Sequence, residues 1–175
     1  MPISVIYFSV ILCLIYTSAF SMSVSNIENA MQPRMKLKHR LSIFDGNLLG
    51  FDGGEWGGQL IFLNADGSAK TLINQNIKSI IKSDNGVYAF TGLAHMDINE
   101  EAVWQIEETS KGTVMARPII QLQGMPEQVQ EHSAGRHVFQ VFTGKFDSMN
   151  TPIFNCFQFA DQAIYPSNKC HKTPY

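Results

Sequence analysis

Acidic side chains gather in three loop sequences of this chain, together with a histidine, a lysine and a tryptophan. The three sequences are DGGEW at 52–56, LAHMDINEE at 93–101 and KFDSMN at 145–150. Carboxylate oxygens are the ligands that Ca²⁺ prefers, and imidazole is a further cation ligand. If the loops meet, the sequence predicts a ligand-binding site formed by Asp52, Glu55, Trp56, His95, Asp97, Glu100, Lys145 and Asp147.

The candidate residues in these loops lack the spacing along the chain that would indicate one particular kind of chemistry. Loops are polar simply because they face water, and the sequence NADGS at 64–68 lacks the later glutamate of a calcium loop. The pair His132 and His137 has no required metal geometry. The sequence contains no Gly-x-Ser-x-Gly elbow, no His-Glu-x-x-His helix and no phosphate-binding loop. It therefore assigns no catalytic residue and no metal ligand, and leaves Ca²⁺ as the one cofactor to consider.

The elements that must position these loops are short strands. From Leu41 onward the apolar runs are short and alternating, and turn residues separate them, with strong hairpin signals at Asp66-Gly67 and Asn85-Gly86. The segment 99–111 could be forced into a helix, but its apolar residues alternate, so a strand is the better prediction. Trp104 lies in this run and is expected in the core, whereas Trp56 is the better candidate for an exposed aromatic. The fold class is all-β, with about eleven or twelve strands.

One pattern of strand, loop and strand occurs three times. It begins at Gly46, Gly86 and Gly135, and the tripeptide Phe-Thr-Gly follows at 90–92 and 142–144. We expect each glycine-led strand to be the same strand of successive four-stranded units, with its large aromatics between neighbouring sheets. One face would carry Val87, Ala89 and Thr91, opposite Tyr88 and Phe90. The later copy would set Phe139, Val141 and Thr143 against Val138, Gln140 and Phe142.

A period of roughly 40 to 50 residues with four strands resembles the blade repeats of β-propellers in bacterial exported proteins. The Asp-Gly turn at 66–67, the Asn-Gly turn at 85–86 and the two Phe-Thr-Gly tripeptides carry the resemblance. It implies a propeller-like stack of about three four-stranded antiparallel units. Closed propellers typically have at least four blades, so an open array or a homodimer is expected. The alternative fold is a β-sandwich or barrel.

The resemblance also bears on function, because propellers commonly bind ligands with the loops at one end. It implies two classes of protein. The first is a non-enzymatic binding or interaction protein, whose partner is another protein or a small ligand. The second is a metal-dependent hydrolase of the lactonase kind, which uses a central metal. The sequence offers only scattered acidic residues and too few blades to enclose a metal, so binding is the favoured function.

The amino-terminal segment predicts export. Residues 1–21 contain no charged side chain, 5–16 form an apolar run of signal-peptide length, and small residues favour cleavage after Ser21. An uncleaved anchor is the alternative, although the run is short for a membrane span. Residues 22–40 are then expected to be a loosely attached arm, and 41–175 a single all-β domain. In the stretch 34–40, alternation favours a strand over a basic cluster that attracts lipid headgroups.

Cysteine content and net charge complete the expectations. The exported part would retain Cys156 and Cys170, which predict a disulfide in an oxidising compartment, with two free thiols as the alternative. Thirteen basic against 15 acidic residues give a net charge of −2, and this near balance argues against a nucleic-acid partner. The sequence thus predicts a periplasmic or secreted protein without a stable membrane span after cleavage.

Overall fold

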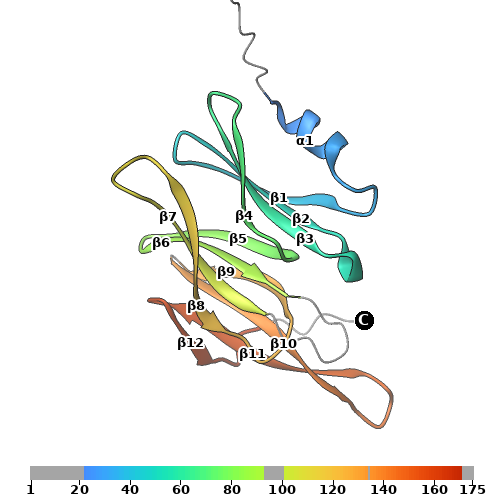
Figure 1. Cartoon of the computed structure of the whole chain (residues 1–175). Coiled ribbons are helices and arrows are strands. Elements are labelled where there is room, and N and C mark those ends of the chain that lie inside the picture. Colours follow the sequence, from blue (N-terminus) through green and yellow to red (C-terminus); the bar gives the residue numbers. More distant parts are fainter. Residues whose placement is uncertain (1–21, 93–100, 134, 171–175) are drawn as a thin grey trace, which may run out of the picture.

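The computed structural model describes residues 22–92, 101–133 and 135–170, and within them the chain forms three four-stranded antiparallel sheets and one α-helix (Figure 1). The sheets follow one another along the chain and are stacked in that order. Their first strands are in contact, β1 with β5 and β5 with β9. The expected all-β, propeller-like stack of three four-stranded units is confirmed, and the described strands form no closed barrel.

Each sheet is a simple up-and-down meander whose strands pair in sequence order. The first sheet contains β1 Lys36–Ile43, β2 Gly46–Asp52, β3 Gly58–Asn64 and β4 Ala69–Ile73. The second contains β5 Ile77–Ser83, β6 Gly86–Thr91, β7 Ala102–Glu108 and β8 Val114–Gln121. The third contains β9 Pro126–Ser133, β10 Arg136–Phe146, β11 Pro152–Ala160 and β12 Ala163–Pro166. The repeated glycine-led strands are therefore β2, β6 and β10, the second strand of each sheet, as expected.

The core consists of the layers between neighbouring sheets, and β6 supplies side chains to both. Val87 and Ala89 pack in the cluster that β6 shares with the first sheet, whereas Tyr88 and Phe90 pack against the third sheet. The rings meet edge to face, with centroids 4.8 Å apart for Tyr88 and Phe159 and 5.2 Å apart for Phe90 and Phe139. Such edge-to-face pairs are favourable because the ring edge is positive and the face negative. The predicted division of β6 into two faces is confirmed.

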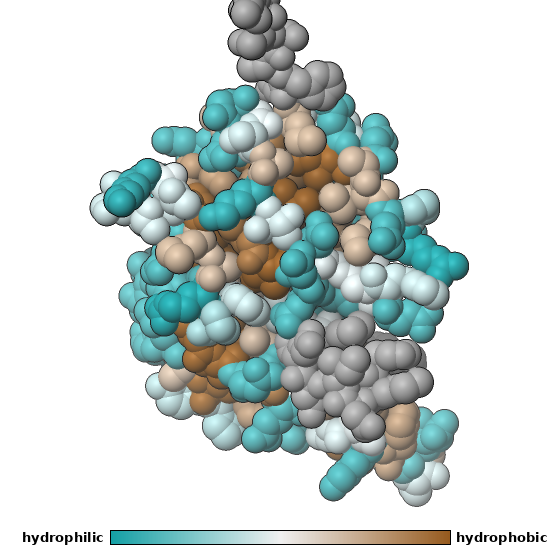
Figure 2. All heavy atoms as spheres, in the orientation of Figure 1, coloured by the Kyte–Doolittle hydropathy of each residue, from teal (hydrophilic) through white to brown (hydrophobic). Residues whose placement is uncertain are grey.

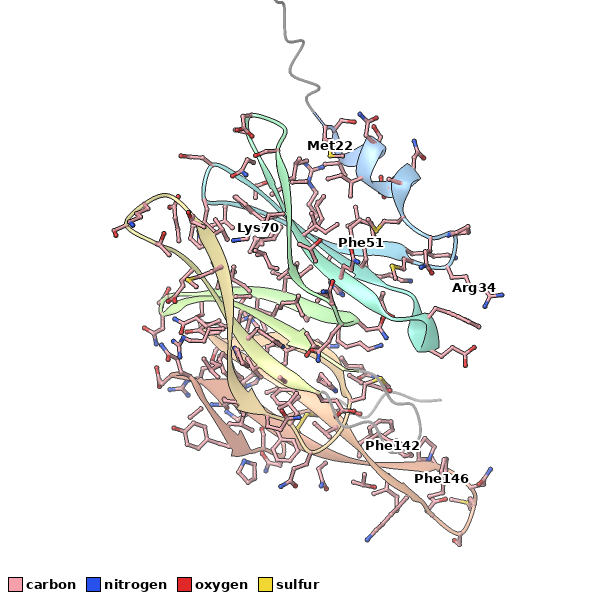
Figure 3. All side chains as sticks on the ribbon, viewed as in Figure 1. Met22, Arg34, Phe51, Lys70, Phe142 and Phe146 are labelled. Carbon is pink, nitrogen blue, oxygen red and sulfur yellow. A yellow bond between two sulfur atoms is a disulfide. The ribbon has the colours of Figure 1, made fainter. Side chains whose placement is uncertain are left out.

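The aromatic residue of the second Phe-Thr-Gly tripeptide differs from the expectation. Phe142 is only half-buried, and its ring lies 5.5 Å from that of Phe146 and 5.6 Å from that of Phe154 (Figure 3). In β10 it is Phe139 and Val141 that pack against the second sheet. Phe142 is less buried than Phe90 because the third sheet is the last one in the described chain, and only one of its faces meets another sheet.

A helix covers the opposite end of the stack. α1 Val24–Ala30 buries Ile27 against Leu49 and Phe51 of the first sheet, and its neighbours in the same cluster are Ile61 and Leu63 (Figures 1 and 3). The Ser23 hydroxyl caps the helix by accepting a hydrogen bond from the Asn26 N–H. The expected loosely attached arm is therefore a packed helix followed by β1, and the sheet begins at Lys36 instead of residue 41. The alternation predicted for 34–40 is the start of β1.

The carboxyl-terminal part of the described chain is fixed by the disulfide between Cys156 and Cys170, which confirms the predicted pairing. The Ser167 N–H also donates to the Cys156 carbonyl at 2.9 Å. These bonds hold residues 167–170 against β11. Of the helices in the described residues, none has the length and apolar character needed to cross a membrane.

Candidate functional site

The first predicted loop, between β2 and β3, is organised by the Asp52 carboxylate. Oδ1 accepts the Gly54 N–H at 2.8 Å, and Oδ2 accepts Nζ of Lys78 at 2.9 Å. Nearby, burial lowers the pKa of His39, and the charge of Asp52 only partly offsets this effect. Both carboxylate oxygens of Asp52 are thus engaged, one in its own loop and the other with a lysine of the second sheet.

A buried amide joins this loop to the second sheet. Asn76 is 1 % exposed; its Oδ1 accepts the Gly53 N–H at 3.1 Å and its Nδ2 donates to the Gly54 carbonyl at 2.5 Å. Its own carbonyl accepts the Gly92 N–H at 3.2 Å. Gly92, the last described residue before the second predicted loop, is thus tied to the same asparagine as the first loop. Sequence reasoning missed Asn76, since nothing in a local pattern marks an amide as buried.

The other two predicted residues of the first loop are at the surface. Trp56 ends the short 3₁₀ helix η1 Gly54–Trp56 and is 52 % exposed, with the Arg34 guanidinium 3.9 Å from its ring centroid. Such a stack of a cation on an indole face is worth about 0.5–1 kcal/mol at an exposed site. Glu55 is exposed beside it. Trp56 is thus partly covered by a side chain of the same molecule.

The predicted residues of the second loop, His95, Asp97 and Glu100, lie outside the described residues. The next residue, Glu101, is 2 % exposed, and its carbonyl accepts the Leu122 N–H at 2.8 Å. This bond holds the end of the second loop to the linker between the second and third sheets. A buried acidic side chain at this place is a feature that the sequence reasoning did not single out.

The third predicted loop is the tip of the β10–β11 hairpin. Asp147 closes the turn, since its Oδ1 accepts the N–H groups of Met149 and Thr151 at 2.8 Å each, and these bonds lower the pKa of the carboxyl group. Lys145 lies within β10, just beyond Gly144, where a φ of 73° interrupts the regular pairing with β11. The structure therefore places Lys145 and Asp147 in the same hairpin but gives them different surroundings.

Lys145 lines a concave feature of the described surface, which we call the intersheet groove. It lies between β8 with its following linker and the face of the third sheet that meets the second, and it has a volume of about 580 Å³. Its apolar lining is formed by Ile120, Leu122, Phe139, Val141, Phe142, Ile153, Phe157 and Ile164. Figure 2 shows apolar side chains at the surface over β8 and the adjacent strands of the third sheet.

The backbone packs closely beside the groove. The linker between the second and third sheets passes so close to β10 that a Cβ at Gly124 would lie 2.8 Å from the Phe142 carbonyl oxygen and 2.9 Å from Cγ1 of Val141. Only glycine allows this approach without a shift of the backbone. The same linker also touches Gly92, where a Cβ would lie 2.9 Å from Pro126. The groove therefore adjoins the end of the molecule at which the predicted loops begin.

The polar groups of the groove are few. Among the described residues of its lining Lys145 is the only charged side chain, and the remaining polar members are Gln121, Gln123, Thr143 and Asn155. The Thr143 hydroxyl is already engaged, because it donates to the Ile153 carbonyl at 2.8 Å. Asn155 is exposed opposite Val141 in the register of β10 and β11. An apolar lining with a few polar groups is the usual composition of a small-molecule site.

Within the described ranges, no set of three or more His, Cys, Asp or Glu side chains could hold a metal ion. The predicted residues of the first and third loops are thus not brought together as one cation site by this part of the chain. No protein-family model matches the sequence, and neither a curated protein nor a solved structure shows significant similarity to it.

Proposed function

We propose that the protein is an exported, non-enzymatic binding protein that holds a small apolar ligand in the intersheet groove. The observation that carries the proposal is the groove itself, in which apolar side chains of β8, β11 and β12 are partly exposed, namely Ile120, Ile153, Phe157 and Ile164. Burying an apolar surface contributes about 25 cal/mol per Å². A ligand that covers these side chains would gain that free energy without a rearrangement of the sheets.

The engagement of the acidic side chains favours binding over metal-dependent hydrolysis. Asp52 is paired with Lys78 and holds the Gly54 N–H, while Asp147 holds two backbone N–H groups of its own turn. Both carboxylates therefore stabilise the loops in which they occur. A hydrolase would need such oxygens directed together at a cation and a water molecule.

A neutral fluorescent probe tests the groove. N-phenyl-1-naphthylamine is expected to bind the wild-type protein with a rise in fluorescence, and Asn155→Trp should weaken this binding at least tenfold because the indole fills the groove. Ile153→Trp, at a lining residue that is 40 % exposed, should act in the same direction. Asn29→Trp is the matched control, since Asn29 is exposed on α1 at the other end of the stack. Equal probe binding by all three variants and the wild type would refute the groove as the ligand site.

Export has its own test. The disulfide supports an oxidising compartment, and the uncharged apolar segment 1–21 supports a cleaved signal peptide. Mass spectrometry of the protein recovered from the exported fraction is expected to find Met22 at the amino terminus. A product that retains Met1 and sediments with membranes would contradict cleavage.

A further inference from the structure

We infer that the ligand of the intersheet groove is a medium-sized apolar monocarboxylate, whose carboxylate binds between Lys145 and Asn155 while its apolar body lies along Phe157 and Ile164, which are both partly exposed. This inference rests on the proposed function and specifies its ligand. It starts from charge, because the described residues of the lining supply one ammonium group and no carboxylate. The electrostatic complement of such a groove is a single negative charge.

The Lys145 ammonium group is available to a ligand. Lys145 is exposed and forms no ion pair or side-chain hydrogen bond with the described residues. The nearest acidic residue along the chain is Asp147, whose Oδ1 is occupied by two backbone N–H groups of the hairpin turn. A cation without a partner among the described residues can pair with a ligand anion without breaking any of the bonds that they form.

Asn155 adds a second donor at a suitable place. Residue 155 pairs with Val141, four residues before Lys145 on β10, which corresponds to about 13 Å along the strand. A lysine side chain extends roughly 6 Å from its Cα and can turn back along the strand. Its ammonium group and the Asn155 amide can therefore approach the same carboxylate above Thr143 and Ile153.

The remainder of the groove determines which apolar group of a ligand can fit. Beyond Asn155 the lining is mainly apolar, with Phe157 paired in register with the buried Phe139, and with Ile120 and Ile164 also in the lining. The groove thus has a polar half near the hairpin and an apolar half near β12. A ligand with one carboxylate and an unbranched chain or an aryl group fits this division, whereas a ligand that is polar at both ends does not.

The test compares decanoate with decanol by displacement of N-phenyl-1-naphthylamine, below the concentrations at which either forms micelles. Wild-type protein is expected to bind decanoate at least tenfold more tightly than decanol, and the difference should shrink as ionic strength rises, because the ammonium group is exposed to solvent. Lys145→Met should remove most of the preference, because it weakens decanoate binding while decanol binding does not weaken. Asn155→Leu should reduce the preference several-fold. Lys111→Met, in the exposed β7–β8 turn, is the matched control and should change neither ligand.

The outcomes separate this inference from the proposed function. If the probe binds and Asn155→Trp blocks it, but decanoate and decanol bind equally, the groove is a ligand site and the carboxylate inference is wrong. Tighter binding of decyltrimethylammonium than of decanoate would overturn it as well. If neither the probe nor decanoate binds the wild-type protein, both proposals fail together.

Discussion

Phe90→Ala is expected to lower the free energy of unfolding by about 3–5 kcal/mol, the usual cost of removing a fully buried phenylalanine ring. The Phe90 side chain is 0 % exposed and lies between the second and third sheets, with its ring centroid 5.2 Å from that of Phe139 and 5.6 Å from that of Phe159. Alanine would leave a cavity that two sheets border. Urea unfolding followed by circular dichroism measures the effect.

The matched control is Phe146→Ala, which makes the same change at a ring that is 54 % exposed on the β10–β11 hairpin. Its cost is expected to stay within about 0.5 kcal/mol, as for most surface substitutions. Phe142→Ala should fall between the two, because Phe142 is half-buried. If Phe90→Ala and Phe146→Ala cost the same, the packing of the second sheet on the third is not as described.

The repeat of four-stranded units could be predicted from the sequence because strands are encoded locally. Alternation shows which side chains share a face, and the glycines before Val87 and Arg136 mark where a hairpin turn requires an unusual backbone. Gly86 has a φ of 139° and Gly135 a φ of 70°, values that favour glycine. These local signals were enough to identify β6 and β10 as equivalent strands.

The alternation of apolar and polar residues does not predict which other elements cover each face of a strand. Phe90 and Phe142 occupy the same place in their tripeptides, yet only the first is buried between sheets. The difference depends on the number of sheets that follow in the stack, which is a property of the whole chain. Likewise, α1 was missed because Val24, Ile27 and Met31 are three spaced apolar residues in a polar stretch, and one short turn of this period is weak evidence for a helix.

The candidate site was only partly accessible from the sequence. Lys145 was selected as a loop residue, and it lines the intersheet groove from within a strand that continues past Gly144. The apolar lining comes from β8, β10, β11 and β12, whose mutual distance is set by how the second and third sheets pack. No spacing along the chain encodes that distance, so no sequence pattern marks Phe157 and Ile120 as residues that line a groove. The hydrogen bonds of Asn76 could not be predicted for the same reason, since they join residues that precede or belong to different sheets.

Removal of the disulfide is the second change with a large expected effect. The double variant Cys156→Ser and Cys170→Ser should unfold with a free energy about 2–4 kcal/mol lower than that of the wild type, because a crosslink that spans 14 residues restricts the unfolded chain. In the folded state the bond also holds residues 167–170 on β11, where the Ser167 N–H contacts the Cys156 carbonyl.

Reduction of the wild-type protein provides the control, because it breaks the same bond without a substitution. The urea midpoint of wild-type protein in excess dithiothreitol should match that of the double variant, and dithiothreitol should leave the variant unchanged. A single Cys170→Ser variant should lose nearly the full amount, since either serine abolishes the crosslink. If reduction leaves the wild-type midpoint where it was while peptide mapping proves the bond broken, the crosslink does not stabilise the fold. The segment 167–170 would then be held by its hydrogen bond to β11 and by packing alone.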